Sequence, residues 1–337
     1  MIAAEPAAQG ALARSDQMVG LRTAWVGHAM GGELEIHLGH AGHRGGGADD
    51  DATGRAQRDA ARAGARVIAW ANRLTRFDAR SDLMRLNADS QTRVAVRPTL
   101  GRALDWANEA EDSTDGLVTP SLLDARLAAE AGMEPQPFTR GRTGRRWQVS
   151  RTPGRAWLVE RAPGLRLDLD GFAKGWLADR ALALLGRYPS AVVAADGDIA
   201  VRVAAGDEWL FGVADPGTDT GDLAVMRLAG GRVPETFGLA TSGTTVHRWA
   251  HGDRTDHHLI DPATRRPART DLVQATVLAS SARRAEILAK AALILGSQAG
   301  LRFLEASTAD GAILLTDRGE RLALTRTLRW LDQETNA

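Results

Sequence analysis

Two kinds of hydrophobic periodicity alternate along this chain, and neither a linker nor an internal repeat separates them. Residues 33–38 place apolar side chains at every second position, which predicts a strand with one buried face. Apolar residues between 56 and 71 instead recur at helical spacing and predict an amphipathic helix. A chain that mixes both periods without a break is expected to form one α+β domain, here over residues 21–337.

The same alternation continues to the end of the chain. The pattern predicts further strands at 165–169, 191–194, 199–203, 210–213 and 274–278. It predicts helices at 99–111, 172–188 and 281–295, with Thr99 as the N-cap of the first. The irregular segments are expected to be a mobile glycine-aspartate loop at 42–54, an insertion or surface hairpin at 132–156 and a hairpin turn at 317–319.

Composition excludes several classes of function. The 337 residues include 44% hydrophobic residues, enough for a sizeable core. Acidic and basic residues number 42 each, so no general electrostatic attraction to nucleic acid or to an anionic membrane is expected. The chain has no cysteine, which excludes disulfides, a cysteine nucleophile and thiolate metal sites.

The first residues indicate neither export nor membrane insertion. Residues 1–20 are rich in alanine and lack periodicity, so we expect a flexible lead without the basic and apolar regions of a signal peptide. No window of the sequence is long and apolar enough for a transmembrane helix. The sequence therefore predicts a cytoplasmic protein.

The segment LDLDGFAKG, which begins at Leu167, has the residues of an anion site. Gly171 and Gly175 bracket Lys174 where a helix is expected to begin, and glycine lets the backbone approach a ligand closely. The free N–H groups of the first helical turn and the ammonium of Lys174 would suit a phosphate or pyrophosphate. The spacing is not that of a P-loop, and an ordinary turn between a strand and a helix explains these residues about as well.

Two later segments carry polar groups that suit a ligand pocket. Thr241, Ser242 and Gly243 follow a predicted strand and offer hydroxyl and backbone donors, although a plain polar turn has the same composition. His258 precedes the turn that Asp261 or Thr264 is expected to cap, and it could transfer protons near neutral pH. Several histidines cluster here, but their spacing does not favour a zinc site, and a single histidine is more often a packed or surface residue.

Two further motifs lie upstream of these three. Residues 75–87 read TRFDARSDLMRLN, and residues 114–120 read TDGLVTP. Together with Met30-Gly31, the ordered series is similar to that of the ApbE family, whose members transfer FMN from FAD to proteins. The similarity runs from about Met30 to Gly296, and each motif is weak by itself while the ordered set is specific.

The resemblance implies a single α+β domain with mixed sheets and flanking helices around an FAD cleft. It also implies a reaction in which a threonine or serine hydroxyl of an acceptor protein receives FMN from FAD and AMP leaves. The positions that match the family's FAD-binding motifs are Met30, Phe77, Leu117, Val118, Thr119, Asp168, Lys174, Thr241, Ser242 and Gly243. By the same resemblance, Met30 and Phe77 would pack on flavin or adenine, Asp168 and Lys174 would hold ribityl or phosphate groups, and His258 would be the acid–base group.

The sequence departs from the family at the positions where the resemblance implies Mg²⁺ ligands. These positions are a carbonyl at Gly171 and two side chains of a late helix, which here are Glu286 and Lys290. A charged lysine has no lone pair for a metal, so Lys290 is expected to replace the ion rather than bind it. Without the resemblance, the two side chains would be interpreted as a solvent-exposed i,i+4 pair. Other departures are Thr119, Asp196 and Arg265, which stand where the family has aspartate, glycine and glycine.

Three functions are compatible with these residues. The first is FAD:protein FMN transfer, with FAD and an acceptor protein as partners. The second is an FAD-binding protein in which transfer is weak or lost, because the metal positions have changed. The third is an FAD pyrophosphatase that releases FMN and AMP.

Overall fold

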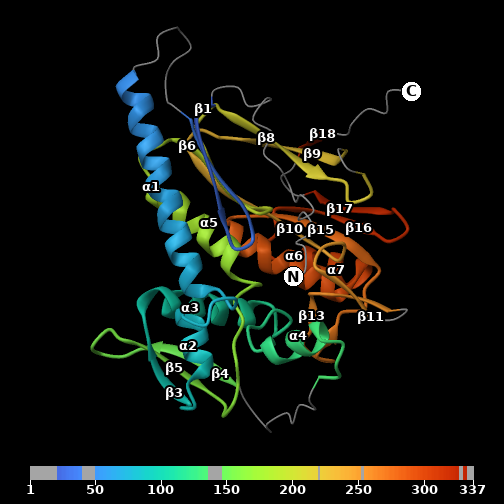
Figure 1. The fold of residues 1–337 in the computed structure, drawn as a ribbon. Helices are drawn as coiled ribbons and strands as arrows, with labels where there is room; N and C mark the ends of the chain where they lie inside the picture. Colours follow the sequence, from blue (N-terminus) through green and yellow to red (C-terminus); the bar gives the residue numbers. More distant parts are fainter. Residues whose placement is uncertain are drawn as a thin grey trace.

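The computed structural model describes residues 21–39, 50–135, 146–218, 221–251, 254–325 and 329–331 (Figure 1). The predicted lead at 1–20 and the loop at 42–49 lie outside the described residues. The helix that follows begins at Asp50, so the predicted loop ends earlier than Gly54. Within the described part of the chain, no helix combines the length and the apolar character that crossing a membrane requires.

An eight-stranded sheet forms the larger part of the molecule. In spatial order its strands are β1 (Leu21–Ala29), β2 (Gly32–Gly39), β6 (Ser190–Ala195), β7 (Asp198–Val203), β10 (Glu235–Gly243), β15 (Leu272–Ala279), β16 (Gly311–Thr316) and β17 (Arg321–Thr325). Every pairing between neighbours is antiparallel. Antiparallel strands with separate helices are the arrangement of an α+β fold, which confirms the predicted class.

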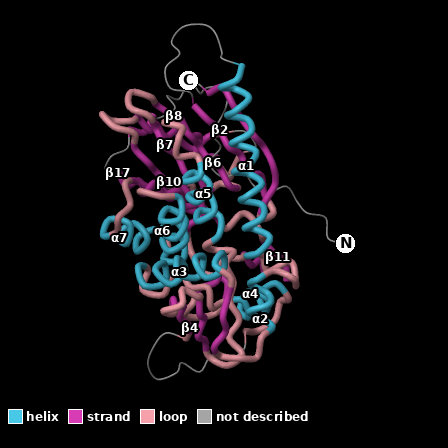
Figure 2. The backbone as a smooth tube through the Cα atoms, turned by 90° about the vertical axis from the view of Figure 1, so that its left-hand side faces the viewer, coloured by secondary structure: helices cyan, strands magenta, loops and turns pink. Residues whose placement is uncertain are grey.

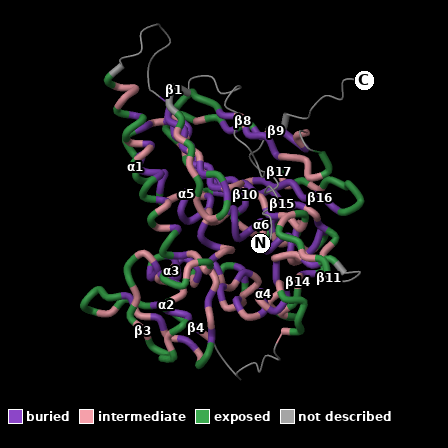
Figure 3. Tube along the Cα trace, viewed as in Figure 1, coloured by how far each residue is buried: buried purple, intermediate pink, exposed green. Residues whose placement is uncertain are grey.

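Helices cover one face of this sheet, and a second, small sheet covers the other (Figure 2). The helices are α1 (Asp50–Leu74), α5 (Ala173–Leu184), α6 (Ala282–Leu295) and α7 (Ser297–Ala306). The small sheet contains β8 (Glu208–Ala214), β9 (Asp222–Ala229) and β18 (Arg329–Leu331). The inner strand β6 is therefore buried on both faces, because Val193 packs in the helix-side core and Val192 in the core beneath β8 and β9. Figure 3 shows buried residues gathered where β10, β15 and α6 lie.

A smaller group of elements lies beyond the ends of α1 and α5, at the bottom of Figure 1. It comprises α2 (Asp82–Ala88), α3 (Pro98–Ser113), α4 (Leu123–Glu130), β3 (Arg93–Val96), β4 (Trp147–Arg151) and β5 (Trp157–Arg161). Strands β4 and β5 form the hairpin that was expected within 132–156, although it extends to Arg161, and residues 136–145 lie outside the described part. Short strands complete the fold at β11 (Arg248–His251), β12 (Arg254–His257), β13 (Ile260–Asp261) and β14 (Arg266–Pro267).

The periodic segments fold as their patterns predict. Leu34, Ile36 and Leu38 on β2 are fully buried, as the alternation requires. Ala60 and Val67 lie on the buried face of α1, where a small side chain lets the helix approach the sheet.

The prediction for Thr99 was wrong. Helix α3 has Arg97 at its N-cap and Pro98 in its first turn, where proline needs no hydrogen bond.

The predicted strand at Leu165–Leu169 is wrong in an informative way. Its odd-numbered leucines are buried as in a strand, but the segment pairs with no described strand. Its backbone is hydrogen-bonded by other groups instead. Asn87 bonds both the N–H and the C=O of Leu167, at 2.8 and 2.7 Å. Arg161 donates to the carbonyl of Leu165 at 2.9 Å, and the N–H of Asp168 donates to Pro120 at 2.8 Å. Side chains thus replace a neighbouring strand.

Candidate active site

A cleft of about 810 Å³ lies between the large sheet and the smaller group of elements. Its lining includes every site residue that the resemblance nominated: Met30, Phe77, Leu117, Val118, Thr119, Asp168, Gly171, Lys174, Thr241, Ser242, Gly243, His258, Glu286 and Lys290. These residues span most of the chain, so the fold brings the separate motifs to one place. The cleft falls within the range of roughly 300–1,000 Å³ that is usual for small-molecule sites.

Met30 enters the cleft from the tight turn between β1 and β2. Both turn residues have left-handed backbones, with φ of 57° at Met30 and 85° at Gly31. A two-residue hairpin of this kind normally takes asparagine, aspartate or glycine, because a side chain is strained there. A methionine that holds such a backbone next to a cleft suggests a role for its side chain.

Phe77, in the segment between α1 and α2, also lines the cleft and is 77% exposed. The guanidinium of Arg76 lies over its ring, 4.3 Å from the ring centroid. Leu117 and Thr119 flank the buried Val118 in the segment that follows α3, where the hydroxyl of Thr114 accepts the N–H of Val118. Together these side chains give the smaller group's wall of the cleft an apolar and aromatic surface.

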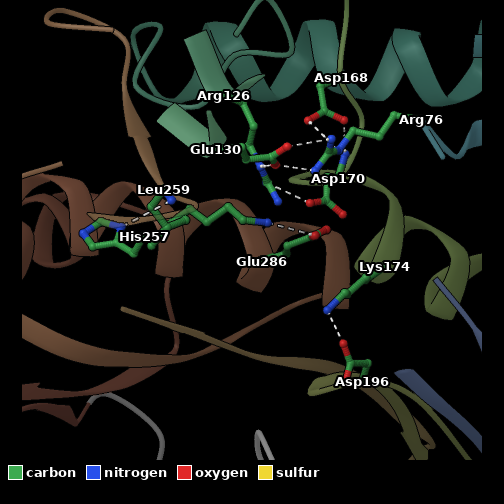
Figure 4. Close-up of polar contacts among 11 residues, drawn as sticks. Arg76, Arg126, Glu130, Asp168, Asp170, Lys174, Asp196, His257, Leu259 and Glu286 are labelled. Atoms are coloured by element: carbon green, nitrogen blue, oxygen red, sulfur yellow. Dashed lines mark hydrogen bonds and ion pairs between the residues drawn. The ribbon is translucent and has the colours of Figure 1, made fainter. Parts of the chain in front are cut away.

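Two arginines and three carboxylates form a network across this wall (Figure 4). Arg126 of α4 contacts Asp170 at 2.8 Å and Glu130 at 3.0 Å. Arg76 also bonds Glu130, and its Nε lies 4.0 Å from a carboxylate oxygen of Asp168. The alternation that buries the leucines of 165–169 turns Asp168 and Asp170 to the same side, toward the arginines.

The two aspartates of this network differ in acidity. Burial and the neighbouring charge of Asp170 raise the pKa of Asp168 to about 6. Burial alone would also raise the pKa of Asp170, but Arg126 and Lys174 outweigh it and hold that pKa below its usual range. Asp170 is therefore the permanent anion between Arg126 and Lys174, while Asp168 titrates near neutrality.

Lys174 lies in the first turn of α5, as predicted, and its ammonium pairs with Asp196 (Figure 4). Burial opposes the charge of Lys174, but Asp196 and Asp198 outweigh burial and raise its pKa. Gly175 does not face the cleft. A Cβ at this glycine would lie 2.7 Å from the backbone of Ala282, so its role is the close packing of α5 on α6.

The segment with Thr241, Ser242 and Gly243 lies on strand β10 rather than after a strand. The hydroxyl of Thr241 pairs with that of Thr276 on the neighbouring β15, at 2.9 Å. Strand register thus places Thr241 opposite Thr276, and of these two residues only Thr241 lines the cleft.

His258 follows β12 and faces His247, with ring centroids 5.3 Å apart and an edge-to-face orientation. Its Nδ1 is buried and has no hydrogen-bond partner among the described residues. Burial, and next the charge of Arg126, lower the pKa of His258 well below 6.5. A neutral imidazole with a free ring nitrogen can accept a proton. Of the two predicted caps of the turn after it, Asp261 is the acceptor, from the N–H of Ala263 and from the hydroxyl of Thr264.

Gly171, Glu286 and Lys290 meet as the resemblance implied, but the group at their centre is the lysine ammonium. Nζ of Lys290 lies 3.1 Å from Glu286 and would lie 3.4 Å from a Cβ at Gly171. The described residues contain no group of three or more histidine, cysteine, aspartate or glutamate side chains that could hold a metal ion. These residues do not fit a divalent cation.

Sequence reasoning missed several residues of the cleft: Arg76, Arg126, Glu130, Asp170, Asp196 and Asp198. A signal existed for two of them. Period-two alternation from Leu165 puts Asp170 on the same side as Asp168, and Arg126 is a charged residue between the alanines and leucines of α4. Nothing local indicates that Arg76 would reach Glu130, which is 54 residues away.

Comparison with known proteins decides the family. The model of the ApbE family matches residues 30–314, which is most of the chain. This protein belongs to the ApbE family. The FAD:protein FMN transferase of Treponema pallidum (strain Nichols) is 32% identical over 172 residues, which are 47% of this chain and 46% of that relative. The alignment therefore spans about half the length of this curated relative.

Solved structures of ApbE proteins share the fold. The ApbE protein of Thermotoga maritima superposes with a TM-score of 0.70 at 20% identity, covering 89% of this chain and 96% of the other. The flavin transferase ApbE of Vibrio cholerae gives a TM-score of 0.65 at 19% identity, with coverages of 91% and 98%. The flavinyl transferase ApbE of Pseudomonas stutzeri gives 0.66 at 18% identity, with coverages of 91% and 95%.

Two departures from the ApbE motifs now have a backbone explanation. Asp196 and Arg265 stand where the family motifs have glycine, and both have positive φ, 49° and 60°. Glycine adopts this conformation without strain, and aspartate adopts it more readily than most residues. Both positions thus have the left-handed backbone that glycine favours, and the Asp196 side chain pairs with Lys174.

Proposed function

We propose that this protein is an FAD:protein FMN transferase, which moves FMN from FAD to a threonine or serine hydroxyl of an acceptor protein and releases AMP. The observation that carries the proposal is the convergence of residues from each of the ApbE motifs on one cleft. Four cationic side chains, Arg76, Arg126, Lys174 and Lys290, line that cleft. Each is paired with a carboxylate that holds it in position, and such fixed cations suit the pyrophosphate of FAD.

In the proposed reaction, the acceptor's hydroxyl oxygen forms a bond to the phosphorus of the FMN half of FAD. The bond from that phosphorus to the bridging oxygen breaks, and AMP leaves with this oxygen. His258 accepts the proton of the hydroxyl, because its Nδ1 has no partner among the described residues and its lowered pKa keeps the ring neutral. Positively charged side chains of the cleft stabilise the charge that develops on the phosphoryl oxygens. The reaction is proposed without a divalent ion, although the resemblance implied Mg²⁺.

One observation favours a second function, an FAD-binding protein with weak or absent transfer. Lys290 provides one positive charge where Mg²⁺ would provide two, and stabilises a transferred phosphoryl group less. Incubation with FAD and a flavinylation-site peptide, followed by nucleotide analysis, separates the functions. AMP in equal amount to flavinylated peptide supports transfer. AMP and free FMN without modified peptide support pyrophosphatase activity, and bound but unchanged FAD supports the binding protein.

Flavin fluorescence titration tests the first step of the proposal. The protein is expected to bind FAD in preference to NAD, because the sequence has the ApbE motif series and lacks the G-x-G-x-x-G fingerprint of a dinucleotide fold after a strand. If FAD does not bind at high micromolar concentration, the proposal is wrong.

Lys174→Ala is expected to weaken FAD binding by about 1–3 kcal/mol, the value of a hydrogen bond to a charged group. Arg180→Ala is the matched control, because it removes one positive charge from the exposed side of the same helix. The measurement is the Kd for FAD, together with the melting temperature of both variants. Equal affinity of the two folded variants would restore the interpretation of Lys174 as part of an ordinary turn.

A further inference from the structure

The charge at the centre of the cleft comes from a residue type that is rare in this chain. Of the 42 lysine and arginine residues only two are lysines, Lys174 and Lys290, and both line the cleft. Arginine serves as the cation almost everywhere else. Lysine differs from arginine in carrying a compact point charge instead of a planar fork. A compact cation is the side-chain group that most resembles a metal ion in size and charge distribution.

The surroundings of Lys290 are built around its ammonium. Its side chain is 14% exposed, and that of Glu286 is 2% exposed, so the pair is not the solvent-exposed helix pair that spacing alone suggests. The ammonium lies against Gly171, where an added Cβ would be 3.4 Å away. Asp170 and Asp198 add two more acidic groups that interact with the charge of Lys290.

Both carboxylate oxygens of Glu286 already accept hydrogen bonds. Its Oε1 accepts a hydrogen bond from Lys290 at 3.1 Å, and its Oε2 accepts one from the backbone N–H of Gly175 at 3.1 Å. This second bond ties the carboxylate to the first turn of α5, the turn that carries Lys174. A divalent ion at this place would have to displace the ammonium and would be repelled by it.

We propose that Lys290 is a built-in cation that occupies the metal position of the ApbE fold, so that this protein binds and uses FAD without a divalent ion. Glu286 is the positioning residue that holds the ammonium between Gly171 and the start of α5. The inference rests on the proposed FAD site for its ligand, but its central claim concerns which cation occupies the position.

The first test measures the metal directly and needs no FAD. Lysine labelled with ¹³C at the ε carbon gives two side-chain signals, one for each lysine of the chain, and Lys174→Arg assigns them. Addition of MgCl₂ to millimolar concentration is expected to leave the Lys290 signal unmoved, and calorimetry should detect no Mg²⁺ binding. A saturable shift of the Lys290 signal with Mg²⁺, or stoichiometric Mg²⁺ binding in the cleft, would overturn the proposal.

The second test compares FAD affinity in EDTA and in MgCl₂. The two Kd values should agree within about twofold for the unmodified protein, and FAD should shift the Lys290 signal. A tenfold or greater loss of affinity in EDTA would refute the built-in cation while leaving the FAD site intact. Absence of FAD binding in both buffers would refute the proposed function instead, and the Mg²⁺ titration would still decide the role of Lys290.

Replacement of both side chains by potential metal ligands provides the converse test. Glu286→Asp combined with Lys290→Thr is expected to create a Mg²⁺ requirement, with FAD bound at least tenfold more tightly in MgCl₂ than in EDTA. Lys290→Thr alone should weaken FAD binding about 10- to 100-fold, the loss of one charge-assisted hydrogen bond. Arg284→Thr, a change on the same helix outside the cleft, controls for lost charge and should bind FAD normally. Normal FAD affinity of folded Lys290→Thr in EDTA would contradict the proposal.

Discussion

Replacement of His258 by asparagine is expected to lower FMN transfer by about 10²–10⁴-fold, the usual contribution of a general acid–base group. FAD affinity should change little, because asparagine keeps a polar side chain of similar size. The Nδ1 of His258 is buried and has no hydrogen-bond partner in the described part of the chain, so it can accept a proton. The measurement is the single-turnover rate of peptide flavinylation, with the Kd for FAD as the companion value.

The same residue predicts an unusual pH profile. Burial and Arg126 lower the pKa of His258 well below 6.5, so the neutral form that accepts protons persists when the pH falls through the ordinary histidine range. The protonation of His258 should therefore cause almost no change in the rate of FMN transfer between about pH 7.5 and pH 6.5. His28→Asn, a change at an exposed position of β1, is the control and should match the unmodified protein. If the His258→Asn variant transfers FMN at the rate of the unmodified protein, His258 takes no part in the mechanism.

Asn87→Ala is expected to destabilise the protein by about 2–4 kcal/mol. The amide of Asn87 makes both hydrogen bonds to the backbone of Leu167, and both groups lie in the core. Alanine would leave a buried N–H and a buried C=O unpaired, and each costs about 1–3 kcal/mol. Urea unfolding followed by circular dichroism measures the loss.

The Asn87→Ala substitution is also expected to weaken FAD binding in the cleft. Asp168 and Asp170 extend from the segment that Asn87 holds, so the variant should also bind FAD more weakly than its residual stability explains. Asn72→Ala, at an exposed position of α1, is the matched control and should change the free energy of unfolding by less than about 0.5 kcal/mol. A loss below about 1 kcal/mol for Asn87→Ala would show that water or a backbone shift replaces its hydrogen bonds.

Local pattern determined most of the elements and the family. The alternation at 33–38 requires a strand with one buried side, whatever the strand packs against, because successive side chains point to opposite faces. The alanine-rich face of α1 likewise needs only helical geometry. The ordered motifs identified the ApbE resemblance, and residues from each of them line one cleft.

Tertiary structure decided the features that depend on distant partners. Residues 165–169 have the pattern of a strand, but Asn87 and Arg161 bond their backbone in place of a neighbouring strand. Arg126 is an ordinary helical arginine in the sequence and becomes a cleft residue because Asp170 lies opposite it. The local sequence does not identify these partners, because the residues of each pair come together only when the chain folds.

Glu286 and Lys290 show both contributions in one pair. Their four-residue spacing on a helix makes them neighbours, so the sequence by itself determined that they would meet. Spacing cannot say whether the pair faces water or a cleft. That was decided by Gly175, whose N–H bonds the second oxygen of Glu286, and by Gly171, which lies against the ammonium. Both glycines belong to a segment more than 100 residues away. Burial by that segment turns a surface ion pair into the charged centre of the cleft, because only the folded chain excludes water from it.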